Sequence, residues 1–294
     1  MNAALATLEP QTGPGVPLLT LLAARNHLSA LEHKDTWARH AAANRARVQY
    51  QVSRLWLDAN QRTGVLIAAG PSLKDSLPEL RALDRAAHEI VCVDMALGFL
   101  LEHGVVPDYV LCSDASEEIA RTLVPAPENV ALLLNVVVHP DTAKNWAGDI
   151  FWFGMMSNYR DKEADDWMQR DHQKKSGISA FLVPGGNVSS LGVSFLASVR
   201  AVPKILLYGH DFCWRDDREF YAGGVQNDLA QQRIKNEAES GTVLTMPDSR
   251  GNPVKTTGSL LAFALWYSDI DRTMPGLLES RTPTTILSLG GKPI

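Results

Sequence analysis

The sequence has only three cysteines among its 294 residues, Cys92, Cys112 and Cys213, and they lie far apart. An odd, scattered set of thiols argues against a disulfide framework and against a cysteine-based zinc site. Cys92 and Cys112 lie in apolar segments, where buried free thiols are expected. This cysteine usage predicts a cytoplasmic protein.

Long apolar runs and an excess of positive charge are also missing. No apolar segment approaches the roughly 20 residues that cross a bilayer, and the N-terminus shows no basic region followed by an apolar core, so we expect neither a membrane partner nor a secretory signal. The 28 Lys and Arg against 33 Asp and Glu give a net charge of −5. This balance disfavours a dedicated nucleic-acid-binding protein but leaves room for a local basic groove.

Apolar segments without a helical period alternate with helical patterns over most of the chain. Continuous apolar strands alternating with helices are typical of a parallel sheet covered on both faces. The predicted strands are 65–69, 89–93, 109–112, 130–138, 149–153 and 204–208. The predicted helices are 77–83, 96–103, 117–123 and 188–199. The pattern predicts an α/β protein with a Rossmann-like, mostly parallel sheet.

Both ends of the chain extend beyond this alternating pattern. A leader of about a dozen residues precedes a helical pattern over 18–60, which predicts two helices forming an arm against the main domain or a partner subunit. We therefore expect a leader and arm over 1–60, a Rossmann-like domain over 61–294, and an arm suited to a homodimer. The C-terminal extension predicts a hairpin over 242–257, an amphipathic helix over 257–271 and a last strand over 284–289.

Polar residues gather where the predicted strands end or the next helix begins. They are Gly70, Pro71 and Ser72; Asp94; Ser113 and Asp114; Gly185, Gly186 and Asn187; and Gly209, His210 and Asp211. Because parallel strands end at the same edge of a sheet, these residues are expected along one crevice. In open α/β sheets such a crevice binds nucleotides, so the pattern predicts a nucleotide site.

The turn at Gly70, Pro71 and Ser72 is the most informative of these segments. Gly70 lets a ligand approach the backbone, Pro71 fixes φ at the turn, and Ser72 can donate its hydroxyl to a phosphate or cap the helix. A plain strand-to-helix turn explains the same residues. Neither a P-loop nor a Gly-x-Gly-x-x-Gly pattern is present.

Each of three further residues has a binding and a structural interpretation. Asp94 can hold a ribose hydroxyl or cap the next helix. Asp114 can orient an acceptor, bind a metal or cap a helix. Asn187, which follows Gly185 and Gly186 at a helix start, can help to hold a pyrophosphate or serve as a simple N-cap.

The best acid–base candidate is His210, because histidine titrates near neutral pH and a neighbouring carboxylate can tune it. Asp211 is then a candidate for positioning, although adjacent residues on an extended backbone point in opposite directions. Trp214 could stack on a base or sugar, but core packing explains such a ring equally well. The other histidines show no metal-ligand spacing, so we predict no resident metal.

Several of these segments, in this order, resemble one group of bacterial and archaeal proteins. The segments are Ala69 to Lys74, Gly104 to Val110, Pro184 to Val188, Leu206 to Phe212, Gly251 to Thr257 and Leu289 to Ile294. They are similar to motifs of the motility accessory factor (Maf) glycosyltransferases and the MptE-like (DUF115) domain, and more distantly of Campylobacter-type sialyltransferases. The resemblance covers about residues 60 to 294 and implies a Rossmann-like nucleotide-binding transferase.

The chain departs from this group at two places that bear on chemistry. MptE-like diphosphokinases carry Thr-Asp-Leu-Asp-Gly after the third strand, where this chain has Cys112-Ser-Asp-Ala-Ser-Glu117, with one aspartate and no glycine. The sialyltransferases place a catalytic histidine where this chain has Gly186 and Asn187. The base must then come from His210, Asp211, Asp114 or elsewhere.

Three functions follow as hypotheses. The first is a glycosyltransferase that moves a sugar from a nucleotide-sugar, of the CMP-nonulosonic acid type, to a hydroxyl of a small or macromolecular acceptor. The second is an MptE-like diphosphokinase, which would use ATP and Mg²⁺ to transfer diphosphate to a hydroxymethyl group of a pterin or similar heterocycle. The third is a non-catalytic nucleotide-binding module.

Overall fold

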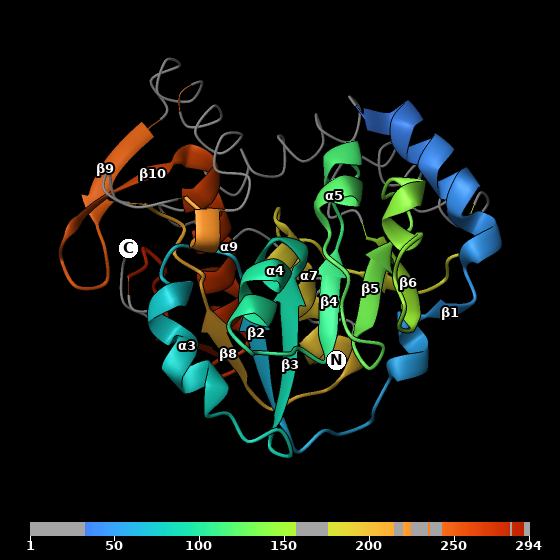
Figure 1. Cartoon of the computed structure of the whole chain (residues 1–294). Coiled ribbons are helices and arrows are strands. Elements are labelled where there is room, and N and C mark those ends of the chain that lie inside the picture. The colour runs from blue at the N-terminus through green and yellow to red at the C-terminus, as the bar shows by residue number, and fades with distance from the viewer. Residues whose placement is uncertain are drawn as a thin grey trace.

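The structure is a computed structural model that describes residues 33–156, 176–214, 220–224, 235, 243–282 and 284–290. Figure 1 shows a central sheet with α3 and α4 on one face and α7 and α9 on the other. The predicted leader and the first part of the predicted arm, residues 1–32, lie outside the described residues. Among the described residues, no helix is long and apolar enough to cross a membrane.

The central sheet is parallel throughout its described pairings, in the order β1-β6-β5-β4-β3-β2-β8-β11, with β7 paired to β6. The strands are β1 Tyr50–Gln51, β2 Thr63–Ile67, β3 His88–Val93, β4 Tyr109–Cys112, β5 Ala131–Asn135, β6 Ile150–Met155, β7 Phe181–Leu182, β8 Ile205–Tyr208 and β11 Leu278–Ser280. This arrangement confirms the predicted α/β, Rossmann-like fold.

The helices cover both faces of this sheet. They are α3 Leu73–Arg81, α4 Asp94–Glu102, α5 Glu117–Thr122, α7 Val188–Ser194 and α9 Gly258–Thr273. Short 3₁₀ turns occur at η1 Arg45–Arg47, η2 Val52–Leu55, η3 Pro140–Ala143 and η5 Ala222–Gly224. The predicted helix over 188–199 is present, but α7 continues into the π-helix η4 Phe195–Val199.

The unbroken apolar runs follow from burial on both faces. Along β2, Val65 and Ile67 pack in the core on the α3 and α4 side, whereas Leu66 packs in the core with α7 and α9. Successive side chains of a strand point to opposite faces, so a strand covered on both sides needs an apolar residue at every position. The thiols of Cys92 and Cys112 are buried in this core, as predicted.

The predicted helical arm is only partly helical. Residues 33–44 form a helix, but residues 45–60 contain 3₁₀ turns and β1, so the prediction of helix up to residue 60 is wrong. The backbone of Tyr50–Gln51 pairs with β6 and extends the sheet by one strand, a tertiary contact that no local pattern shows. The division of the chain at residue 60 stays a prediction.

The C-terminal extension follows the prediction in two of its three elements. The hairpin of β9 Val243–Pro247 and β10 Pro253–Thr257 is present, and α9 follows it directly. The predicted strand over 284–289 is wrong, because β11 at Leu278–Ser280 takes the place beside β8. Residues 284–290 bond instead to the loop after β8, to the hairpin turn and to α9.

Candidate functional site

The sheet reverses its strand order between β2 and β8. The chain builds β2 to β6 stepwise toward one side of the sheet and then returns to place β8 on the other side of β2. Ligands of open α/β sheets bind outside the carboxyl ends of the strands at such a reversal. Here the two segments at that point are Gly70 to Ser72, after β2, and Gly209 to Asp211, after β8.

Direct hydrogen bonds join these two strand ends. The Asp211 carboxylate accepts from the Ser72 N–H at 3.3 Å and from the Ser72 hydroxyl at 2.8 Å. The Gly70 N–H donates to the Gly209 carbonyl at 3.0 Å. Gly70 must lack a side chain, because an added Cβ would lie 2.0 Å from Asp211 Oδ2. Gly70, Pro71, Ser72 and Asp211 therefore form one unit, which we call the β2–β8 clamp.

Threonines that follow β11 complete the clamp. The Thr284 hydroxyl donates to Asp211 Oδ1 at 3.3 Å, and the Thr285 hydroxyl donates to the His210 carbonyl at 2.7 Å. Thr282 Oγ1 accepts from the His210 N–H at 3.0 Å. Three hydroxyls thus fix the segment that follows β8, and sequence analysis assigned none of them to the site. The run of threonines after a strand was the available signal.

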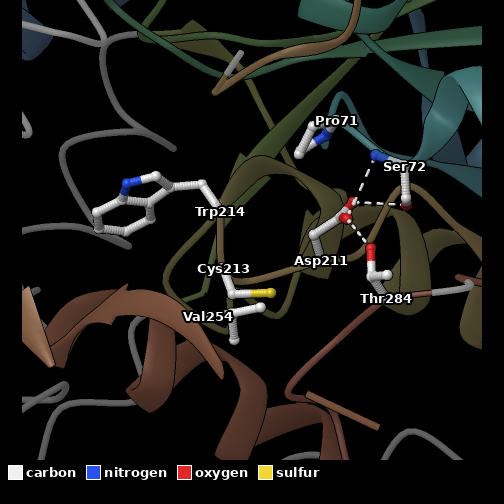
Figure 2. Close-up of a pocket in the computed structure, with 7 residues that line it drawn as sticks. All are labelled: Pro71, Ser72, Asp211, Cys213, Trp214, Val254 and Thr284. Atoms are coloured by element: carbon white, nitrogen blue, oxygen red, sulfur yellow. Dashed lines mark hydrogen bonds between the residues drawn. The ribbon is translucent and has the colours of Figure 1, made fainter. Parts of the chain in front are cut away.

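A small cavity of about 10 Å³ lies against the clamp (Figure 2). Its lining residues are Pro71, Ser72, Asp211, Cys213, Trp214, Val254 and Thr284. This volume is comparable with the room for one water molecule, so it receives a single small group and not a whole nucleotide. Val254, from β10, is a further residue that sequence analysis did not assign to the site.

Hydrogen bonds from neighbouring residues engage both oxygens of the Asp211 carboxylate. It is 2% exposed, and its two oxygens accept the three hydrogen bonds from Ser72 and Thr284. Burial raises the pKa of Asp211 to about 7, although these hydrogen bonds favour the charged form. These hydrogen bonds hold the two strand ends together.

Asp94 differs from Asp211 because one of its oxygens has no partner. It begins α4 directly after β3, and its Oδ1 accepts from the Met95 N–H at 2.8 Å. Among the described residues, Oδ2 is buried and makes no hydrogen bond of ordinary geometry, although the Cys112 thiol lies close enough to favour the charged form. Burial raises the pKa of Asp94 to about 6, and the nearby charge of Asp114 acts in the same direction, whereas the Met95 N–H and the Cys112 thiol oppose it. A buried, unsatisfied acceptor of this kind calls for a donor group from elsewhere.

Asp114 follows β4, the strand beside β3. It is half-buried, and its Oδ1 accepts from the Ser116 N–H at 2.8 Å. Ser116, not Asp114, caps α5. Asp94 and Asp114 are the two carboxylates that the structure brings together at this edge. The described residues contain no group of three or more His, Cys, Asp or Glu side chains suited to a metal ion.

Asn187 caps α7, which is one of its two predicted roles. Its Oδ1 accepts from the Ser190 N–H at 2.9 Å and from the Ser189 hydroxyl at 3.2 Å. Its Nδ2 makes no hydrogen bond within the described part of the chain and is available to a ligand. Gly185 lies against the Trp266 ring, and Gly186 has a φ of 98°, which explains the two glycines structurally. Asn187 does not line the cavity of Figure 2.

His210 lies in the core behind the clamp. It is 1% exposed, its Nδ1 bonds to the Tyr208 carbonyl at 3.0 Å, and its Nε2 has no partner. Its ring packs edge-on against Tyr267, with 5.3 Å between centroids, and Tyr267 bonds to Ser189 at the start of α7. Burial lowers the pKa of His210 to about 4 and keeps the ring neutral. His210 and Asp211 thus point to different surroundings, as their adjacency predicted.

The comparisons with known proteins agree with the observed fold. A model of the family "6-hydroxymethylpterin diphosphokinase MptE-like" matches residues 39–217. The chain is also similar to a solved structure of a Maf glycosyltransferase from Magnetospirillum magneticum AMB-1, with a TM-score of 0.60 and 16% identity. That likeness concerns the fold and covers 89% of this chain but only 38% of the other. No curated protein matches the chain.

The family match spans more than half of the sequence and includes the clamp, Asp94 and Asp114. It agrees with the predicted resemblance and with the broader prediction of a transferase. The chain therefore belongs to the 6-hydroxymethylpterin diphosphokinase MptE-like family.

Proposed function

We propose that this protein is a nucleotide-dependent glycosyltransferase that moves a sugar from a CMP-nonulosonic acid type of donor to a hydroxyl acceptor. We infer the nucleotide site from Asp94 Oδ2, which makes no hydrogen bond of ordinary geometry among the described residues. Asp94 follows β3, which lies next to β2 and the β2–β8 clamp. A ribose hydroxyl donating to Oδ2 would satisfy this buried acceptor. The place matches the crevice at which α/β sheets bind nucleotides.

The clamp and Asn187 supply the phosphate end of this site. The Ser72 N–H and the Thr284 hydroxyl are already bonded to Asp211, so the clamp holds the turn rigid, and Pro71 and Thr284 line the small cavity beside it. The Nδ2 of Asn187 is a donor for the phosphate. A leaving CMP carries a single phosphate, which such donors stabilise as its charge develops. Trp214 lines the cavity, but its ring points away from Asp211 in Figure 2 and packs against Phe220, with 5.7 Å between centroids.

Asp114 is the group that fits acceptor deprotonation best. It is half-buried at the same edge, and within the described part of the chain its Oδ1 accepts from the Ser116 N–H while Oδ2 makes no hydrogen bond. The acceptor hydroxyl would lose its proton to Asp114 as its oxygen attacks the anomeric carbon and the bond to the CMP oxygen breaks, with inversion. His210 is enclosed by Tyr267 and Phe212 and acts, in this proposal, as a positioning residue.

Two further features support glycosyl transfer. The likeness to the Maf glycosyltransferase covers 89% of the chain, whereas the family model stops at residue 217. Val254 and Thr284, which line the cavity, lie beyond that point. The part of the chain that completes the clamp is therefore not accounted for by the diphosphokinase family model alone.

Isothermal titration calorimetry with CMP, UDP and ATP, each with and without Mg²⁺, tests this proposal. We expect CMP to bind without Mg²⁺ and Asp94→Asn to weaken CMP at least about tenfold, through loss of a charged hydrogen bond. Asp269→Asn, at a half-buried carboxylate of α9 that pairs with Arg272, is the matched control and should bind CMP normally. Tight binding of ATP with Mg²⁺ and none of CMP would refute glycosyl transfer from CMP.

The juxtaposition of Asp94 and Asp114 favours diphosphate transfer as the second candidate. Mg²⁺ prefers oxygen ligands and is often held by one or two carboxylates together with substrate phosphates, so these residues fit it. When bound, the ion would neutralise charge on the transferred diphosphate. Release of AMP from ATP in the presence of a hydroxymethyl pterin, lost in Asp114→Asn, would establish this reaction.

A further inference from the structure

A second, larger hollow lies at the same edge of the sheet, between α5 and η3. Its volume is about 340 Å³, and it is distinct from the cavity at the clamp. Its lining residues are Glu117, Ala120, Arg121, His139, Asp141, Lys144 and Asn145. In Figure 1, α5 stands beside the turn that follows β5, at the carboxyl ends of β4 and β5. All but one of the lining residues are polar.

Three of these side chains present N–H donors to the hollow. The Arg121 guanidinium projects from α5, where it is also paired with Glu117, and the Lys144 ammonium follows η3. His139 Nδ1 accepts from the Asp141 N–H at 3.3 Å, so its proton is on Nε2. A guanidinium, an ammonium and an imidazole N–H around one hollow suit an anionic group.

The turn that carries His139 is held in place by the helix over residues 33–44. The Asn44 side chain is fully buried and donates to the carbonyls of Val136 and Val138 at 2.9 and 3.0 Å. The His40 ring packs edge-on against His139, with 5.2 Å between centroids. These contacts fix the backbone and the ring on one side of the hollow. The hollow is therefore formed before any ligand binds, which lowers the cost of binding.

We propose that this hollow binds the anionic group, a carboxylate or a phosphoryl group, of the acceptor substrate. The inference rests on the proposed function and deepens it, because it gives the acceptor a chemical class. Neighbouring strands lie roughly 4.8 Å apart, so β4 and β5 lie roughly 10 to 15 Å from β2 along the edge. Asp114, at the end of β4, lies between the two sites. Glu117 and Asp141 provide acceptors for hydroxyl groups beside the anion.

Titration of the full chain with inorganic phosphate and, separately, with glucuronate tests this inference, with the His139 ring signals followed by NMR at fixed ionic strength. We expect saturable shifts with at least one probe, and a dissociation constant at least about tenfold weaker in Arg121→Gln/Lys144→Gln. The two probes distinguish a phosphoryl from a carboxylate ligand. Arg272→Gln/Lys204→Gln is the matched control, because these exposed cations also have ion-pair partners on the surface.

A parallel titration with CMP separates this inference from the proposed function. We expect Arg121→Gln/Lys144→Gln to bind CMP as the unchanged protein does. If the unchanged protein does not bind CMP but binds the probe saturably, the nucleotide site is contradicted and the anion site is not. Probe binding that does not saturate, survives the double substitution or is equally weakened in the control would overturn the anion site.

Discussion

At the residue scale, the clamp depends on one missing side chain and one buried carboxylate. Gly70 leaves the space that the Asp211 carboxylate fills, and the carboxylate in turn holds the Ser72 N–H and hydroxyl. The turn after β2 is thereby tied to the loop after β8. Because these two segments form part of the wall of the small cavity at the proposed nucleotide site, a change at either residue should affect both stability and nucleotide binding.

Gly70→Ala tests this dependence. Its Cβ would lie 2.0 Å from Asp211 Oδ2 and 2.4 Å from the Gly209 carbonyl oxygen, and the latter belongs to the backbone and cannot rotate away. We expect the free energy of unfolding, measured with urea, to fall by about 2–3 kcal/mol, and CMP binding to weaken. Gly258→Ala is the control, because no atom lies within 4 Å of its added Cβ. An equal loss in both variants would contradict the steric argument.

Two adjacent residues should give opposite pH dependences of stability. Burial lowers the pKa of His210 to about 4, below its usual 6.5, so between these values the unfolded chain binds the extra proton and stability falls as pH falls. Burial raises the pKa of Asp211 to about 7, above its usual 3.8, so the folded chain binds the extra proton and stability falls as pH rises toward 7.

Urea unfolding of His210→Gln and Asp211→Asn between pH 4 and pH 7 measures both effects. As pH rises, the free energy of unfolding of the unchanged protein should increase relative to that of His210→Gln. The increase should be up to about 1.4 kcal/mol per pH unit. The difference for Asp211→Asn should shift the other way. Differences that move in the same direction would show that one of the two groups does not titrate as its burial predicts.

The sequence predicted that some of these residues would meet, but not how they would bond to one another. Ser72 and Asp211 meet at one cavity, as expected from their places after parallel strands. That Asp211 would bond to Ser72, while Asp94 kept an unpartnered oxygen, depends on side-chain packing between strands that are distant in the chain. Thr284 was unpredictable for the same reason, since its partner lies 73 residues away.

At the element scale, α7 begins at a residue with two separable functions. Asn187 Oδ1 caps the helix by accepting from the Ser190 N–H, while Nδ2 is available to a phosphate. The helix N-terminus itself carries a partial positive charge that favours an anion. A substitution that keeps the cap but removes the donor can therefore distinguish a structural role from a binding role.

Asn187→Asp makes this distinction. Asp is as good an N-cap as Asn, so we expect stability to change by less than about 0.5 kcal/mol. CMP should bind much more weakly, because a carboxylate replaces the amide donor and repels the phosphate. Thr257→Asn, at the buried cap of α9, is the control, because it exchanges one N-cap residue for another without adding a charge, and it should leave CMP binding unchanged. If CMP binds Asn187→Asp normally, Asn187 is only a cap.

The elements that were mispredicted share a physical cause. The apolar run over 130–138 resembles one strand, but the strand ends at Asn135 and the next three residues turn to receive Asn44 and His40. The segment over 284–289 alternates like a strand, yet β11 already occupies the edge beside β8. Local pattern identifies apolar segments, whereas their backbone partners are set by the rest of the fold.

At the scale of the whole molecule, the carboxyl ends and the amino ends of the strands hold different groups of polar residues. The clamp, Asp94 and Asp114 lie at the carboxyl edge. Near the amino edge, Glu89 is fully buried and bonds to Arg200 at 2.6 Å, to Asn60 at 2.7 Å and, as an ion pair, to Arg62 at 3.3 Å. Glu89, on β3, and Asp94, directly after it, lie five residues apart, roughly 17 Å along the strand direction. The ionic group is therefore remote from the proposed chemistry.

Breaking this ion pair should lower stability without affecting the site. Arg200→Met leaves the Glu89 charge buried without its nearest counterion, and we expect a loss of about 3–5 kcal/mol in the free energy of unfolding. Glu89→Gln/Arg200→Met should recover part of that loss, because a neutral amide tolerates burial and can still accept from Asn60. CMP affinity, measured below the unfolding transition, should stay unchanged in both variants. A loss of CMP affinity as large as that of Asp94→Asn would show that the two edges are coupled through β3.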